Sequence, residues 1–262
     1  MNLPEYVRSE IDAGALFVAS HSAGKDSQAM LIAMLKMGVP ANQTLIVHAD
    51  LDDVEWRGNM DHIRKYAGSI PIITALARTS FWEMVERRGM FPSPGQRQCT
   101  SDLKRGPINR EVRRYLKAHP EFNNRVVMCM GMRKQESANR NDMIPWRFSE
   151  EHSLFDKSFW KSRKFVRGRD WFEWLPIHDM TSDEVFASIA AADQEPHWAY
   201  GKGMSRLSCC FCIMASKSDL TISARENPEL YLRYVEMEKR IGHTLSMSQK
   251  PLEAITGIKA AA

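Results

Sequence analysis

A short polar turn, Ser22 to Ser27, carries residue types that bind phosphate. It reads Ser-Ala-Gly-Lys-Asp-Ser, and its small residues let backbone N–H groups approach a bound anion. It follows an apolar strand-type run, 15–19, and precedes a segment, 27–37, with apolar residues at helical spacing. The start of a helix adds about half a positive charge, and Lys25 adds a full one. The pattern predicts a phosphate site, and the alternative is an ordinary strand-to-helix turn with a solvated lysine.

Three acidic residues follow the next strand-type run, 44–48, at Asp50, Asp52 and Asp53. In parallel sheets, ligands bind beyond the carboxyl ends of the strands. Carboxylates at such an end suit a ribose or Mg²⁺, and the alternative is a solvated loop.

The cysteines are unevenly spaced. Of five in the chain, Cys209, Cys210 and Cys212 lie within four positions, and three thiols so close cannot all point inward from one regular element. In a reducing compartment such clustering indicates metal or redox chemistry rather than a disulfide framework. A metal-free redox trio is the alternative. Cys129 lies within a strand-type run, which predicts burial as a small apolar residue.

Strand-type and helical runs alternate along most of the chain, which predicts βαβ units and a mostly parallel sheet. Thr181 to Glu184 is a capping box that predicts a helix start. The expected strands are 15–19, 44–48, 70–74, 125–130 and 175–177, and the expected helices are 27–37, 54–67, 80–88, 101–119, 185–192 and 229–241.

Regular periodicity is lost between residues 134 and 174, where cations and aromatic rings are interleaved. This composition suits phosphate pairing and base stacking with a nucleotide or single-stranded nucleic acid. The alternative is a solvated loop whose rings pack on the core. The residues concerned are Arg140, Trp146, Arg147, Phe148, Phe159, Trp160, Lys161, Arg163, Lys164, Phe165, Arg167, Arg169, Trp171 and Phe172.

The bulk composition suits one sizeable α/β domain with an appendage: 262 residues, of which 44% are hydrophobic. No apolar run approaches the roughly 18 residues of a membrane span. The first ten residues carry acids and lack the apolar core of a signal peptide. We therefore expect a cytoplasmic protein without membrane contact. The net charge of +4 is compatible with nucleotide or nucleic-acid substrates.

The Ser22–Ser27 loop resembles the SGGKDS signature of the PP-loop ATP pyrophosphatases, which cleave ATP between its α and β phosphates. Three further stretches resemble, in the same order, blocks of one branch, the phosphoadenosine phosphosulfate (PAPS) reductase family. Residues 98–108 are similar to its C-T-x-x-L-K-x-x-P block, and 131–140 to its G-x-R-x-x-E-S-x-x-R block. The third stretch is 175–177 with the following helix and the downstream cysteines. The resemblance spans about residues 15 to 240.

This resemblance implies a doubly wound, mostly parallel α/β sheet of the adenine nucleotide α-hydrolase-like type, with a helical, cysteine-containing C-terminal part. It implies a nucleotide-binding domain over 1–200, with the basic aromatic insert near 138–174, and a C-terminal region over 201–262 packed on it. Glu136 is expected to orient Arg133 or Arg140 rather than act as a base. The implied catalytic residues are Lys25, Asp26, Lys104 and Arg133, and the implied nucleotide-binding residues are Ser20, Ser22, Gly24, Ser27, His48, Asp50, Gly131, Glu136 and Arg140.

The chain also departs from the family's reductases. Thioredoxin-dependent members carry a C-terminal Glu-Cys-Gly-Leu-His motif, which the tail ITGIKAAA lacks. Iron–sulfur members carry a Cys-Cys pair upstream and a Cys-x-x-Cys downstream. Here Cys99 matches one member of the pair, Thr100 replaces the other, and Cys209 and Cys212 are separated by Cys210 and Phe211. This arrangement is closer to members that work with a cysteine desulfurase to insert sulfur into DNA backbones, and to short phage-encoded members.

The resemblance thus implies an ATP pyrophosphatase that adenylylates a substrate, with ATP and Mg²⁺ as cofactors, for sulfur transfer to nucleic acid. DNA and a cysteine desulfurase are the implied partners, and a homodimer is left open. Cys99, Cys209, Cys210 and Cys212 would hold a [4Fe–4S] cluster, or alternatively Zn²⁺. The alternatives are a reductase of PAPS or adenylyl sulfate, and a non-catalytic nucleotide-binding subunit of a sulfur-transfer complex.

Overall fold

The computed structural model describes residues 3–154 and 168–260. Contacts divide the chain into two compact units, each built from segments far apart in the sequence. The first comprises residues 1–48, 63–73 and 110–196, and the second comprises 49–62, 74–109 and 197–262.

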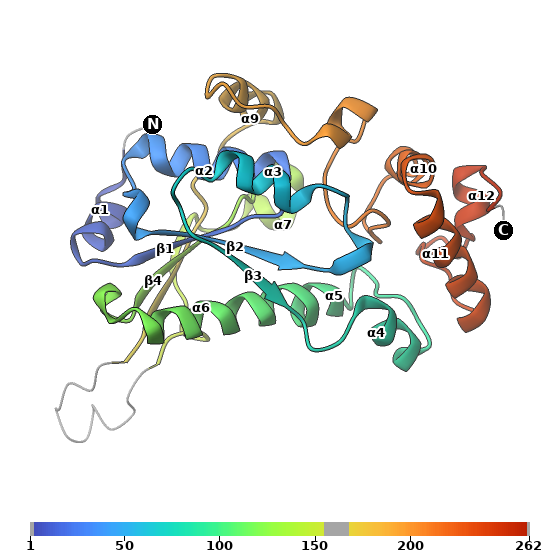
Figure 1. Cartoon of the computed structure of the whole chain (residues 1–262), viewed down its shortest axis with the longest axis horizontal. Coiled ribbons are helices and arrows are strands. Elements are labelled where there is room, and N and C mark those ends of the chain that lie inside the picture. Colours follow the sequence, from blue (N-terminus) through green and yellow to red (C-terminus); the bar gives the residue numbers. More distant parts are fainter. Residues whose placement is uncertain (1–2, 155–167, 261–262) are drawn as a thin grey trace. The chain divides into compact units, whose positions relative to one another are not determined.

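The first unit is organised around a six-stranded sheet with the strand order β3-β2-β1-β4-β6-β5 (Figure 1). β1 is parallel to β2 and β4, β4 is parallel to β6, and β5 is antiparallel to β6. The strands are β1 Leu16–Ser20, β2 Thr44–Asp50, β3 Ile72–Leu76, β4 Arg125–Cys129, β5 Trp146–Phe148 and β6 Asp170–Trp174. The last residues of β2 and β3 lead into the second unit. The predicted doubly wound, mostly parallel sheet is therefore confirmed.

The strand order reverses between β1 and β4. From β1 the chain builds outward through β2 to β3, and it then returns to place β4 on the other side of β1. Ligands of such sheets bind beyond the strand ends at this reversal. The loop after β1 and the segment after β4 both start there.

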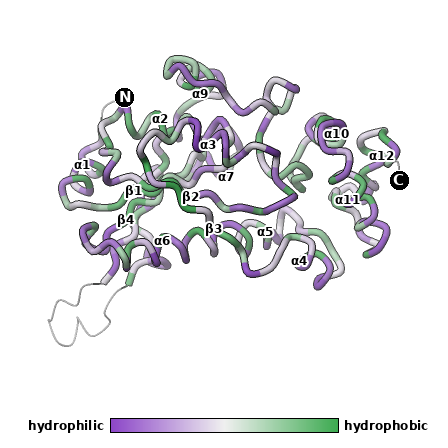
Figure 2. Tube along the Cα trace, viewed as in Figure 1, coloured by the Kyte–Doolittle hydropathy of each residue, from purple (hydrophilic) through white to green (hydrophobic). Residues whose placement is uncertain are grey.

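Helices cover both faces of the sheet, and Figure 1 shows α2 on one side and α6 on the other. Figure 2 shows hydrophobic residues along the central strands, and the first four residues of β1 are fully buried. Cys129 in β4 is also fully buried, as predicted. The helices and short helical turns that lie wholly or partly in the first unit are α1 Glu5–Asp12, α2 Lys25–Met37, η1 Ala41–Gln43, α3 Asn59–Tyr66, α6 Gly106–Ala118, η4 Pro120–Phe122, η5 Lys134–Glu136, α7 Ala138–Asn141 and α9 Ser182–Ala190.

Two sequence-based expectations were wrong in their position. The strand expected at 175–177 lies just upstream as β6, and residues 176–179 form turns. The segment without periodicity thus contains regular structure, namely η5, α7, β5 and β6. Cross-strand aromatic packing carries these strands, with Trp146 of β5 stacked on Phe172 of β6 at 5.2 Å between ring centroids. The helix expected from residue 54 begins only at Asn59, after an irregular stretch that includes Glu55 to Gly58.

The second unit is helical. Its helices and turns are η2 Asp52–Val54, α4 Phe81–Arg88, α5 Gln98–Thr100, a π-helical turn η3 Ser101–Arg105, η6 Trp198–Lys202, α10 Lys217–Glu226, α11 Pro228–Ile241 and α12 Leu252–Thr256. Its core is aromatic: Tyr234 of α11 packs on Phe81, Trp82, Phe91 and Phe211, with ring centroids 4.7 to 6.0 Å away.

None of the helices in the described parts of the chain combines the length and hydropathy that a membrane crossing requires.

Candidate functional site

The predicted phosphate loop joins β1 to α2 through one left-handed residue. Ala23 has φ 62° and is fully buried, and its N–H donates to Nδ1 of His21 at 3.1 Å. Gly24 is the N-cap of α2 and has no side chain with which to cap it. Because the first N–H groups of a helix lack intrahelical acceptors, the start of α2 offers donors to an anion. The Ser27 hydroxyl donates to the Gly24 carbonyl at 2.9 Å and fixes this turn.

One carboxylate links the two cations of the site. Asp26 accepts from Lys25 Nζ at 3.2 Å through one oxygen and from Arg133 Nε at 2.6 Å through the other. Lys25 and Arg133 are only 3% and 4% exposed. The cluster of these three side chains carries a net single positive charge at the N-terminus of α2. Buried cations held in place by a shared carboxylate are suited to polyphosphate binding.

The segment after β4 lies against the loop through a glycine. A Cβ on Gly131 would stand 2.6 Å from the carbonyl oxygen of Asp26 and 3.0 Å from the Ser27 nitrogen. Only glycine permits this approach, because real Cβ atoms essentially never come within 3.0 Å of another heavy atom. The G-x-R stretch therefore brings Arg133 to Asp26, from 107 residues away in the sequence.

Glu136 contacts both arginines, and the expected role of orienting Arg133 or Arg140 stays a prediction. Its Oε2 accepts from the Arg133 backbone N–H at 2.8 Å and also pairs with the Arg140 guanidinium. The Arg133 guanidinium is further held by Gln135 Oε1 at 2.5 Å and the Met180 carbonyl at 3.3 Å. With its carboxylate engaged in this way, Glu136 serves as a support.

Three predicted nucleotide-binding residues occupy different environments. Ser20 is the half-buried last residue of β1. His48 is 2% exposed and its Nδ1 lies 2.9 Å from the His21 carbonyl oxygen, so it positions the loop from behind. Asp50 belongs to the second unit, where it accepts from the Asp52 backbone N–H at 2.8 Å. Nucleotide contact by these residues stays a prediction.

The second unit gathers the cysteines around a lysine. Cys99 lies in α5 and Lys104 in the following π-helical turn, five residues later. The negative charge of the Cys209 thiolate raises the pKa of Lys104, and Glu55, Cys212 and Cys99 add to this effect. The lysine therefore lies beside three thiols that come from two distant segments.

Burial opposes ionisation of the free thiols. It raises the pKa of Cys99, and it raises that of Cys209 to about 11, although the Lys104 charge acts in the opposite direction. Cys210 is fully buried, its backbone N–H donates to the Val54 carbonyl at 2.9 Å, and burial raises its thiol pKa strongly. Cys99, Cys209 and Cys212 remain partly exposed.

Cys99, Cys209, Cys210 and Cys212 were expected to hold a [4Fe–4S] cluster or Zn²⁺. Within residues 3–154 and 168–260, no three His, Cys, Asp or Glu side chains are arranged to hold a single metal ion. A Zn²⁺ centre requires four donors in a tetrahedron around one ion, whereas a [4Fe–4S] cluster spreads its thiolates over four iron atoms. The Tyr234 hydroxyl is buried at these cysteines without a hydrogen-bond partner among the described residues. Four thiols, the Lys104 cation and a buried hydroxyl donor are thus the groups that this unit offers to a ligand.

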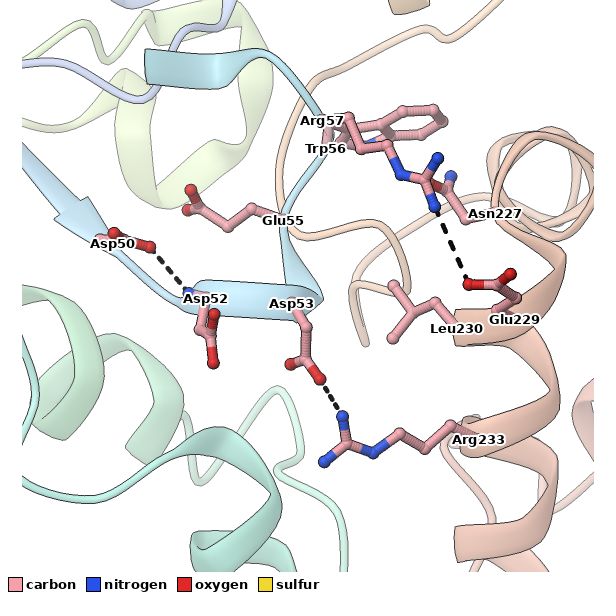
Figure 3. Close-up of a pocket in the computed structure, with 10 residues that line it drawn as sticks. All are labelled: Asp50, Asp52, Asp53, Glu55, Trp56, Arg57, Asn227, Glu229, Leu230 and Arg233. Atoms are coloured by element: carbon pink, nitrogen blue, oxygen red, sulfur yellow. Dashed lines mark hydrogen bonds and ion pairs between the residues drawn. The ribbon is translucent and has the colours of Figure 1, made fainter.

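A cavity of about 460 Å³ opens in the same unit (Figure 3). Asp53 in its wall pairs with Arg233 and accepts from the Trp82 indole N–H at 3.0 Å. Figure 3 shows Asp53 and Arg233 pointing toward one another from η2 and α11. Glu55 lines the cavity and also acts electrostatically on Lys104 and Cys209. The complete lining is Asp50, Asp52, Asp53, Glu55, Trp56, Arg57, Asn227, Glu229, Leu230 and Arg233, so carboxylates outnumber cations.

The described part of the basic aromatic insert packs on the fold. Trp171 is fully buried, and Trp146 is sandwiched between Tyr6 and Phe172. Arg147 pairs with Glu173 at 2.5 Å, and both Arg169 donors reach the His152 carbonyl. These rings pack on the fold within strands rather than in a solvated loop, and nucleic-acid contact by the insert stays a prediction. Phe159, Trp160, Lys161, Arg163, Lys164, Phe165 and Arg167 lie outside the described residues.

Sequence reasoning missed two residues of the cysteine region. Glu55 follows the three predicted acids directly, and its position in that acidic run was the available signal. Tyr234 lies within a correctly predicted helix, on the buried face that also contains Tyr231 and Val235. Periodicity indicates burial but says nothing of whether a buried hydroxyl has a partner.

Comparison with known proteins shows one family match. A model of the phosphoadenosine phosphosulfate reductase domain matches residues 16–215. The chain is 24% identical over 229 residues to an uncharacterized protein of Methanocaldococcus jannaschii, covering 86% of this chain and 48% of that protein. It is 26% identical over 161 residues to an uncharacterized 37.8 kDa protein of Escherichia phage 186, covering 62% and 43%. The chain thus spans about half the length, or less, of these curated relatives.

Similar solved structures include the PAPS reductase of Candida auris in a phosphate complex, at 14% identity and a TM-score of 0.46. That match covers 78% of this chain and 86% of the other. The FMN adenylyltransferase of Candida glabrata, in complex with FAD and pyrophosphate, matches at 12% identity and a TM-score of 0.44. That match covers 75% of this chain and 55% of the other.

Proposed function

Because the chain belongs to the phosphoadenosine phosphosulfate reductase domain family, we propose that its first unit binds ATP at Ser22–Ser27 and adenylylates a substrate. The observation that carries this proposal is the Asp26 carboxylate, which holds Lys25 and Arg133 together at the N-terminus of α2. Donors from a helix start and two buried cations are the elements that a polyphosphate requires.

The chemistry is a displacement at the α-phosphorus. A substrate oxygen or carboxylate attacks, a bond from the substrate to the α-phosphorus forms, and the bond between the α-phosphorus and the bridging oxygen breaks. Pyrophosphate leaves with the electron pair of that bond. Lys25 and the start of α2 stabilise the charge that develops on the leaving group, while Arg133 and Gly131 hold the loop in position. Mg²⁺ enters with ATP.

Pyrophosphate release tests this function. The full chain is incubated with ATP and Mg²⁺, and pyrophosphate, AMP and inorganic phosphate are quantified together. Because no acceptor is added, water takes the place of the substrate at the α-phosphorus, so equal amounts of AMP and pyrophosphate are expected, without formation of ADP. Lys25→Ala removes a charge-assisted contact of about 1.5–3 kcal/mol. We therefore expect the rate of pyrophosphate release to fall at least tenfold in this variant. Release by Lys25→Ala at the wild-type rate contradicts the proposal.

We further propose that the second unit serves sulfur transfer through a [4Fe–4S] centre. Cys99, Cys209 and Cys212, with Cys210 as the fourth thiol, would hold it, and Lys104 would offset its negative charge. When bound, such a cluster supplies one-electron chemistry and iron that binds sulfur. A cysteine desulfurase remains the proposed sulfur donor. Anaerobic purification followed by iron, sulfide and zinc analysis tests the centre, and Cys212→Ser is expected to lose it.

The acceptor is proposed to be nucleic acid, with DNA as the first candidate. The cavity is acidic and therefore repels a phosphodiester backbone. We expect DNA to bind elsewhere on the chain, and the cationic residues within 161–167 are the candidates for DNA contacts that the sequence offers. The proposal predicts that DNA affinity falls steeply as the salt concentration rises. It also predicts that this salt dependence is weaker in the triple variant Arg163→Ala, Lys164→Ala, Arg167→Ala. Absence of DNA binding at low salt contradicts it.

Two alternative functions give different readouts. A sulfonucleotide reductase releases sulfite from PAPS or adenylyl sulfate in the presence of a reductant and leaves ATP intact. A non-catalytic subunit binds ATP but releases neither pyrophosphate nor sulfite. Both assays on one preparation, together with an ATP-binding isotherm, distinguish the three functions.

A further inference from the structure

The Tyr234 hydroxyl is a buried donor without a partner. The side chain is fully buried, and its hydroxyl oxygen has no hydrogen bond to any described residue. A buried polar group in this state is costly, and native structures retain few of them without a reason. The hydroxyl therefore requires an explanation.

The Tyr234 ring packs against the cysteine segment, residues 209–212. Its ring lies 4.8 Å from the ring of Phe211, which stands between Cys210 and Cys212 in the sequence. Phe91 stacks on the same ring at 6.0 Å, and Trp82 contacts it edge-on at 4.7 Å. These contacts fix the ring, so the hydroxyl has little freedom to seek another acceptor.

Burial raises the pKa of the Tyr234 hydroxyl, and the negative charges of the Cys209, Cys210, Cys212 and Cys99 thiolates raise it further. A neutral thiol is a weak acceptor, whereas a thiolate, free or bound to metal, is a strong one. The missing bond is therefore the one that forms when the cysteines hold their ligand.

We propose that Tyr234 is a positioning residue of the four-cysteine centre, and that its hydroxyl donates a hydrogen bond to a ligating sulfur. This inference rests on the proposed [4Fe–4S] centre and adds a residue to it from α11. Hydrogen bonds to cluster sulfurs stabilise the reduced, more negative state and raise the reduction potential. With Lys104 on the same group, the chain provides two donors to it from separate elements.

The chain offers a matched control on the same helix. Tyr231 also packs on Phe211, at 5.7 Å between ring centroids, and it is 2% exposed. Its hydroxyl, however, has partners away from the cysteines, the Thr256 hydroxyl and the Ile258 carbonyl, each at 2.8 Å. Tyr234→Phe and Tyr231→Phe each remove one hydroxyl from neighbouring turns of the same helix. The Tyr231 hydroxyl has hydrogen-bond partners, whereas the Tyr234 hydroxyl has none among the described residues.

The experiment compares both variants with the full wild-type chain, purified anaerobically and reconstituted with iron and sulfide. Iron content, the electron paramagnetic resonance spectrum of the reduced state and the midpoint potential are measured. Tyr234→Phe is expected to retain iron but to shift the potential negative, by about 59 mV for each tenfold loss in stabilisation of the reduced state in a one-electron couple. Tyr231→Phe is expected to keep the wild-type potential and to lower the thermal midpoint.

Each outcome decides the inference. A wild-type potential in Tyr234→Phe overturns the role of Tyr234 and leaves the cluster intact. Equal shifts in both variants also overturn it, because a general packing effect then explains the result. A wild-type chain that takes up no iron overturns both this inference and the proposed centre, while ATP binding measured on the same sample shows whether the nucleotide function stands.

Discussion

Gly131 and the backbone of Asp26 are in direct contact: a methyl group on Gly131 would lie 2.6 Å from the Asp26 carbonyl oxygen. The contact joins the end of β4 to the first turn of α2, across the reversal in strand order. The position of the carboxylate between Lys25 and Arg133 follows from it.

Gly131→Ala is expected to displace the first turn of α2. Overpacking of this kind costs about 1–3 kcal/mol, and we expect ATP affinity to fall about tenfold or more because the loop donors and Lys25 move together. An ATP-binding isotherm and a urea unfolding curve measure the two effects. Gly95→Ala is the control, since a Cβ there meets nothing within 4 Å. Equal ATP affinity in the Gly131 variant and in wild type contradicts the prediction.

Arg133→Lys separates geometry from charge. Lysine keeps the positive charge but cannot reach Asp26, Gln135 and the Met180 carbonyl together, as the buried guanidinium does. We expect a loss of about 2–3 kcal/mol in the free energy of unfolding and at least tenfold weaker ATP binding. Arg147→Lys, at an exposed pair with Glu173, is expected to change stability by less than about 0.5 kcal/mol. Wild-type ATP affinity in Arg133→Lys is the opposing result.

Ala23→Gly is expected to stabilise the fold slightly. An L-residue in the left-handed region costs about 1–2 kcal/mol, of which the buried methyl group returns about 0.8 kcal/mol. The net gain is of the order of 0.5 kcal/mol. Ala29→Gly, in the interior of α2, has the opposite sign and costs about 1 kcal/mol or more. Urea midpoints measure both variants, and a loss of stability in Ala23→Gly as large as that in Ala29→Gly rules the strain argument out.

His197 is expected to make stability fall in acid. It is 1% exposed and contacts His62 at 5.3 Å between ring centroids, and burial followed by the His62 charge lowers its pKa to about 4. Between about pH 4 and its ordinary value of 6.5, the unfolded chain binds more protons, so stability rises with pH through this window and levels off above it. The contribution is at most about 3 kcal/mol.

His197→Asn removes this titration while keeping an acceptor for the Ala199 N–H that His197 now caps. Urea midpoints at pH 5, 6 and 8 are expected to rise less steeply in the variant than in wild type. Identical pH profiles would assign the acid sensitivity to other groups.

The parallel sheet and the phosphate loop were predictable because local sequence encodes them. Alternating apolar runs fixed β1, β2 and β4, and the N-cap and capping-box residues fixed the starts of α4 and α9. The strand β6 was not predictable from periodicity, because its buried residues, Trp171 and Trp174, lie three positions apart and do not alternate as strand residues usually do. Residues 175–177 are apolar, but the chain turns from Pro176 onward. Pro176 and the hydrogen bond from the His178 N–H to the Leu175 carbonyl both favour this turn.

Within the site, chemistry was more predictable than geometry. Lys25 was identified by type, and Asp26 and Arg133 through the family resemblance, but the bridge that Asp26 forms between the two cations depends on residues 107 positions apart. The environment of Lys104 likewise follows from the convergence of two cysteine segments. Contacts between residues far apart in the sequence cannot be predicted from a local sequence pattern. The buried Tyr234 hydroxyl without a hydrogen-bond partner among the described residues is a further example.

The strand order also has a consequence for how the chain folds during synthesis. β1 pairs first with β2, which ends thirty residues after it, whereas its other edge stays unpaired until β4, which begins 75 residues after the end of β2. Until then an apolar strand edge, Leu16 to Ala19, stays open, and such edges recruit other chains. Nascent chains that end before Cys129 are therefore expected to need a chaperone, and the phosphate loop becomes competent only after Arg133 has left the ribosome.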